Sequence, residues 1–62
     1  MIVSKLEDMK LLIEQAIVDG KKAEAGNKSA AIRVRGLMTA VTKSSKAARM
    51  EALALKNNHK QS

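Results

Sequence analysis

The chain has 62 residues and a net charge of +6, and it contains no Cys, Phe, Trp or Tyr. A chain this short forms at most one small domain, and without Cys it has neither a disulfide framework nor a thiolate metal site. Without aromatic rings it lacks the stacking platforms that usually hold single-stranded nucleic acid, and no apolar run approaches the roughly 20 residues that span a bilayer.

The positive charge is concentrated in the second part of the chain. Residues 1–26 carry five acids and four bases, a net charge of −1, whereas residues 27–62 carry eight bases and one acid, a net charge of +7. Such a split predicts that the second part binds a polyanion, with nucleic acid as the leading candidate. The absence of Pro and the abundance of Ala, Leu, Met, Lys and Glu favour helix along almost the whole length, so we expect an all-α fold without strands.

Apolar residues in the first part recur at alternating steps of four and three, which is the spacing of one face of an α-helix. The sequence Ser4-Lys5-Leu6-Glu7 fits a capping box, in which the Ser4 hydroxyl accepts from the Glu7 amide and the Glu7 carboxylate accepts from the Ser4 amide. We therefore expect a first helix over about 4–25. Its apolar stripe consists of Ile2, Leu6, Met9, Ile13, Ala16, Gly20 and Ala23.

A turn is expected at about 26–28. Gly26 can take the left-handed conformation that ends a helix, and Asn27 or Ser29 can cap the helix that follows. These adjacent stop and start signals favour an antiparallel two-helix hairpin. The alternative is one continuous helix with a weak point, since Gly inside a helix costs only about 1 kcal/mol.

A second helix is predicted over about 28–56, because apolar and small residues again alternate in steps of three and four. This stripe consists of Ala31, Val34, Met38, Val41, Ser45, Ala48, Ala52 and Leu55, with Leu37 beside it. The polar stretch 57–62 is expected to be a disordered tail. Residues 1–56 then form the single helical domain.

The basic residues of the second helix fall on one side of it. At 100° per residue they occupy an arc of roughly 140°, largely displaced from the apolar stripe. Such a row of cations can follow the phosphates of a duplex without reading its bases. We call this row the basic stripe; it comprises Lys28, Arg35, Lys43, Lys46, Arg49, Lys56 and Lys60, and Arg33 lies outside it.

A lone hairpin of this size buries little apolar surface, so we expect self-association. Leu12 and Ile17 widen the stripe of the first helix beyond the seam of a two-stranded coiled coil, which suits contact with more than one neighbour. The expected assembly is a homodimer or higher oligomer, in which two hairpins form a four-helix bundle or coiled coil.

The stretch from Ala23 to Arg35 contains Gly26-Asn27-Lys28, then small residues, then Arg-x-Arg. It closely resembles the turn-and-basic-helix signature of the linker-histone-like nucleoid proteins of the chlamydial type, a family with small members in other bacteria and in phages. Without a gap, the resemblance extends over roughly residues 5–56 and takes in Lys43, Lys46, Arg49 and Glu51.

The resemblance implies a sequence-tolerant, DNA-compacting nucleoid protein with a self-associating helical core. We expect a small form without the long Lys- and Ala-rich tail of larger members, and Ala40, Ala47, Met50 and Ala54 occupy positions that are basic or acidic in the family. We therefore expect modest binding or bridging of DNA rather than strong condensation. The family's basic positions, together with Lys56 of the basic stripe, give the expected DNA-contacting residues Lys28, Arg33, Arg35, Lys43, Lys46, Arg49 and Lys56.

No catalytic constellation is present in the sequence, because it has no Cys nucleophile, no phosphate-cradling Gly-rich loop and no converging carboxylates. We expect no enzymatic activity, cofactor, metal, membrane or small-molecule substrate. The expected partner is double-stranded DNA, with RNA left open, and the expected place is the cytoplasm at the nucleoid, or the host cell for a phage- or virus-encoded chain. The alternative function is an oligomerising helical protein-interaction module without nucleic-acid binding.

Overall fold

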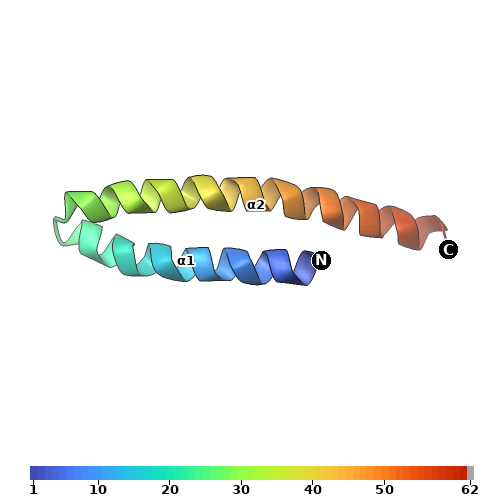
Figure 1. The fold of residues 1–62 in the computed structure, drawn as a ribbon, viewed down its shortest axis with the longest axis horizontal. Helices are drawn as coiled ribbons and strands as arrows, with labels where there is room; N and C mark the ends of the chain where they lie inside the picture. The colour runs from blue at the N-terminus through green and yellow to red at the C-terminus, as the bar shows by residue number, and fades with distance from the viewer. Residues whose placement is uncertain (62) are drawn as a thin grey trace.

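The computed structural model describes the backbone of residues 1–61 and the side chains of residues 1–57. It contains two helices, α1 (Ile2–Glu24) and α2 (Lys28–Gln61), which lie side by side and antiparallel, and the described residues include no strand (Figure 1). The hairpin is a rod of 54 × 14 × 13 Å between Cα atoms. The predicted all-α hairpin is confirmed.

The turn between the helices is built from a helix-ending motif at Gly26. Gly26 has a φ of 108°, and its amide donates to the Ala23 carbonyl at 3.0 Å. The Asn27 amide donates to the Lys22 carbonyl, also at 3.0 Å. These two bonds define a Schellman motif, which satisfies carbonyls at the end of α1 and needs a residue without Cβ strain at its left-handed position. A single continuous helix is therefore excluded.

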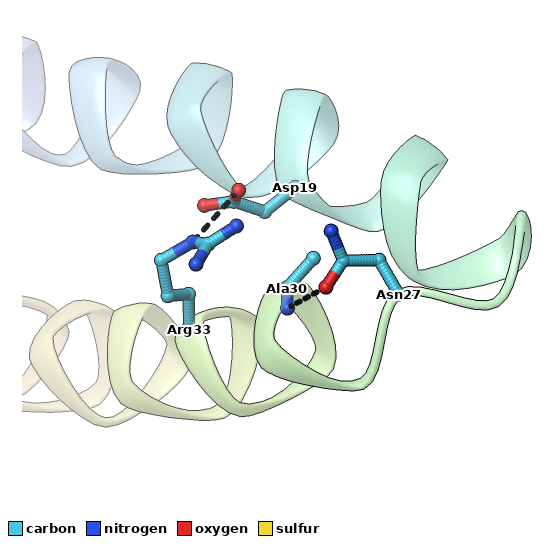
Figure 2. Close-up of polar contacts among 4 residues, drawn as sticks. All are labelled: Asp19, Asn27, Ala30 and Arg33. Atoms are coloured by element: carbon cyan, nitrogen blue, oxygen red, sulfur yellow. Dashed lines mark hydrogen bonds and ion pairs between the residues drawn. The ribbon is translucent and has the colours of Figure 1, made fainter.

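Asn27 also begins α2. Its side-chain Oδ1 accepts a hydrogen bond from the Ala30 amide at 3.0 Å (Figure 2). Its carbonyl accepts from the Ala31 amide at 3.2 Å. This is an N-cap, worth about 1 kcal/mol compared with an apolar residue. The predicted capping role thus falls to Asn27 and not to Ser29.

The two outer helix ends differ from the sequence-based boundaries. α1 begins at Ile2 with Met1 as its N-cap and without a side-chain cap, so the capping box predicted at Ser4 and Glu7 is not formed. Ile2 is half-buried, and its burial offsets the roughly 1 kcal/mol that such a cap contributes. The α2 backbone is helical through Gln61, into the stretch 57–62 expected to be a disordered tail; Ser62 lies outside the described residues.

Small residues lie where the helices meet. Ala30 and Ala48 are 0% and 8% exposed, and they are the only buried apolar residues in the part of the chain whose side chains are described. Half-buried residues continue this line of contact, which we call the seam. Its members are Ile2, Lys5, Met9, Leu12, Ala16, Asp19 and Ala23 on α1, and Ala30, Val34, Leu37, Val41, Ser44, Ala48 and Glu51 on α2. Gly20, Ala40 and Ser45 are also half-buried and lie at the edges of the seam.

The seam is rotated with respect to the predicted apolar stripes. Leu12 and Leu37 are half-buried in it, whereas the stripe members Ile13 and Met38, one residue further along each helix, are exposed. One residue corresponds to a turn of about 100°. Part of the apolar surface that periodicity assigned to the interior therefore faces away from the other helix.

The Gly26 turn can be tested by replacement with Ala. Gly26→Ala should lower the free energy of unfolding by roughly 1–2 kcal/mol, because a Cβ strains the left-handed backbone. Gly36→Ala is the matched control, since Gly36 lies inside α2 with open space around its Cα and has no positive φ. It should raise stability by up to about 1 kcal/mol. Urea unfolding at one fixed protein concentration measures both, and equal effects would contradict this account of the turn.

Candidate nucleic-acid interface

The basic stripe lies on the outer side of α2. Its six members with described side chains are all exposed: Lys28, Arg35, Lys43, Lys46, Arg49 and Lys56. At 100° per residue the centre of this arc lies roughly 160° from the centre of the seam, so the stripe points away from α1. From Lys28 to Lys56 it extends over roughly 42 Å at 1.5 Å per residue.

Arg33 is placed differently from the other predicted DNA-contacting residues. Its Nε donates to Asp19 Oδ1 of α1 at 3.1 Å, close to the turn (Figure 2). The carboxylate offsets the charge of the guanidinium and turns it toward α1. Arg33 therefore connects the two helices, which agrees with its position outside the basic stripe.

Glu51, the single acid of residues 27–62, also faces α1. Its Oε2 lies 2.8 Å from Lys5 Nζ, and its Oε1 lies 3.5 Å from the amino group of Met1. The hydrogen bond from Lys5 and the charges of both cations hold the pKa of Glu51 below its ordinary value, although partial desolvation opposes them. As a result, the only side-chain carboxylate of α2 pairs with Lys5 and the amino group of Met1 at the end of the seam and does not lie within the basic stripe.

Sequence reasoning missed both ion pairs, although a signal for them was present. Asp19 and Arg33 lie at equal distances on either side of Gly26, and Lys5 and Glu51 are within about one helical turn of such a match. In an antiparallel hairpin, residues equidistant from the turn face each other. Opposite charges at such positions indicate cross-helix pairs once the turn has been located.

Apolar side chains interrupt the basic stripe near its far end. A shallow depression is lined by Lys46, Arg49, Met50 and Leu53, all from α2. Their spacing of three and four residues is that of neighbours on one helix face, so this is a mixed apolar and cationic surface and not a cleft between elements. Within the described residues no three His, Cys, Asp or Glu side chains gather where they could hold a metal ion.

A small all-α hairpin whose basic side chains are exposed along one helix fits the class of small histone-like proteins. The chain belongs to the family described as histone H1-like protein Hc1, whose model matches residues 3–58. This membership confirms the resemblance to histone-like nucleoid proteins and places the chain in a DNA-binding, non-enzymatic family. No curated protein and no solved structure matches the chain. Neither helix, over the described residues, has a segment long and apolar enough to cross a membrane.

The lowered pKa of Glu51 predicts a pH dependence of stability. A carboxylate with a lower pKa in the folded state stabilises the fold above its unfolded pKa of about 4.3, and this contribution is lost as the pH falls through the folded pKa. Urea midpoints measured between about pH 3 and pH 7 should therefore fall toward acid, and Glu51→Gln should flatten the curve. The control is Glu14→Gln, at an exposed position of α1. If Glu14→Gln flattened the curve equally, the pH dependence would come from the net charge of the protein and not from Glu51.

The Asp19–Arg33 pair predicts a coupling between the two residues. In a double-mutant cycle of Asp19→Asn and Arg33→Gln, the interaction energy should be about 0.5–1 kcal/mol, the upper range for pairs open to solvent. It should shrink at 1 M salt, where screening is strong. Thermal or urea unfolding provides the measurement. Additive effects of the two substitutions at low salt would show that this ion pair does not stabilise the hairpin.

Proposed function

We propose that this protein binds double-stranded DNA through the phosphate backbone and without sequence preference. The observation that carries the proposal is the exposed basic stripe of α2, which contains no carboxylate, in a chain of the histone H1-like family. The contacting residues are Lys28, Arg35, Lys43, Lys46, Arg49 and Lys56. Arg33 has a supporting role, because Asp19 engages its guanidinium.

The mechanism follows from the charge and the shape of α2. Ammonium and guanidinium groups on the stripe displace condensed counterions from the phosphates, and the released ions drive binding. The row extends along α2 for roughly 42 Å, so it lies along the duplex instead of placing a few side chains against base edges. Phosphate contacts position a protein but carry no sequence information. RNA duplexes offer the same phosphate charge and are a second possible ligand.

Self-association is part of this proposal. A homodimer carries twice the net charge of +6 and presents two basic stripes. Because the two helices of one hairpin bury only two apolar residues among those described, a second copy is expected to supply further apolar contact. In the cell, the proposed place of such a particle is the nucleoid.

Salt titration of DNA binding tests the function. With about six phosphates engaged, log K should fall against log salt with a slope near −5, and the dissociation constant at physiological salt should be roughly 10⁻⁴ to 10⁻⁶ M. Fluorescence anisotropy with several unrelated duplexes measures both. An absence of binding at low salt, or binding insensitive to salt, would favour a protein-interaction module instead.

Charge-matched variants test the role of the stripe. Arg35→Gln with Lys46→Gln should weaken binding to all duplexes alike and reduce the salt slope by about 2, because each substitution removes a cation that neutralises one phosphate. Lys10→Gln with Lys21→Gln removes the same charge from exposed positions of α1, and it should leave the slope almost unchanged. Equal weakening by the two variants would show that net charge, and not the basic stripe, governs binding.

A further inference from the structure

The two sides that flank the seam differ in chemistry. On each helix, the residue that follows several seam positions is apolar or small: Leu6, Ile13 and Gly20 on α1, and Ala31, Met38 and Ala52 on α2. One step along a helix turns it by about 100°. Because the two helices are antiparallel, a rotation of about 100° from the seam, taken in the chain direction on each helix, ends on the same side of the hairpin. These residues, together with Ile17, therefore share one side, which we call the apolar side.

The opposite side of the seam is more polar on α1 and carries mainly small residues on α2. The residues that precede seam positions there include Asp8, Gln15 and Lys22 on α1, and Ser29, Ala40 and Ala47 on α2, while Leu11 and Val18 lie between this side and the outer face of α1. The Asp19–Arg33 and Lys5–Glu51 ion pairs are displaced from the seam in this direction. Cross-helix charge pairs thus close one side of the hairpin. The other side exposes Leu6 and Ile17, at 50% and 54%, together with Ile13 and Met38.

We infer that the apolar side packs against the apolar side of a second copy, with α1 of each protomer beside α2 of the other. This inference depends on the proposed self-association and is independent of DNA binding. The overlapping part of the hairpin is about 35 Å long and two helix widths, or roughly 20 Å, across. Its area is roughly 700 Å², close to the 800 Å² per partner of a stable interface.

Charge selects this arrangement over its alternative. A twofold axis across the helices would place α2 beside α2, although residues 27–62 carry a net charge of +7. A twofold axis parallel to the helices places each α2 beside an α1, and residues 1–26 carry a net charge of −1. The second arrangement keeps the two α2 helices diagonal to each other and brings both turns to the same end of the bundle.

The basic stripe remains largely open in this assembly. Lys28, Arg35, Lys43 and Lys46 are centred on the outer face of α2, whereas Arg49 and Lys56 have the same angular positions as Ala31 and Met38 on the apolar side, further along α2 toward its C-terminal end. The two diagonal α2 helices therefore present their stripes on opposite edges of the particle. The dimer interface and the four outer cations of the stripe therefore use different faces of the same helix, and Arg49 and Lys56 adjoin the dimer interface.

The proposed interface is tested by a matched pair of double variants. Leu6→Gln with Ile17→Gln changes the apolar side, whereas Leu11→Gln with Val18→Gln changes residues of similar size on the outside of α1, where they are 58% and 56% exposed. In sedimentation at micromolar concentration without DNA, the first variant should dissociate at least tenfold more readily than the parent, and the second should not. Equal weakening would overturn the choice of face, and a helical parent monomer would overturn self-association itself.

A distance measurement on the otherwise unchanged chain tests the arrangement, even if the first variant loses its fold. A spin label on Ala25→Cys, an exposed position at the turn, reports whether the two turns lie at one end. The parallel twofold axis places the labelled backbones about 14 Å apart, the diagonal of a bundle with 10 Å spacing. Label separations below about 25 Å are expected. Separations of about 35 Å or more, the length of α1, would overturn the arrangement.

Discussion

The reversal of the chain at Gly26 and Asn27 is the constraint on which the rest of the structure depends. The left-handed Gly26 ends α1, and the Asn27 side chain caps α2 one residue later. Because no loop of variable length intervenes, the turn determines both the direction of α2 and the register in which the helices meet. Both cross-helix ion pairs follow from that register, since Asp19 and Arg33 are equally far from Gly26 and Lys5 and Glu51 are within about one helical turn of being so.

In a hairpin of two helices, each helix is covered by the other on only one side. The seam uses Ala30 and Ala48 for close approach, and larger apolar side chains such as Leu6, Ile17 and Met38 are left exposed. This division explains how a chain with 45% apolar residues can form a hairpin with so little buried surface. Leu6, Ile13, Ile17 and Met38 lie beside the seam. Other exposed apolar side chains lie on the outer faces, Leu11 and Val18 on α1, and Ile32 and Met50 among the cations of α2.

The fold was predictable because its signals are local. Gly26 and Asn27 mark the turn, and the steps of three and four residues mark both helices. The rotation of the seam was not predictable, since periodicity averages over every apolar contact of a helix and does not distinguish a neighbour in the hairpin from one in a second copy. Ile13 and Met38 thus entered the predicted stripes, whereas Leu12 and Leu37 occupy the seam. The predicted cap at Ser4 failed because the burial of Ile2 is a tertiary effect.

The basic residues differ in role according to their positions around α2. Family resemblance treats Arg33 and Arg35 alike, but two positions on a helix differ by about 200°. Arg33 therefore reaches Asp19 on α1, while Arg35 points outward with the basic stripe. Glu51 is likewise held by Lys5 and the amino group of Met1. Pairing these charges across the seam stabilises the hairpin and leaves the outer face of α2, from Lys28 to Lys56, without a carboxylate to weaken its attraction for phosphate.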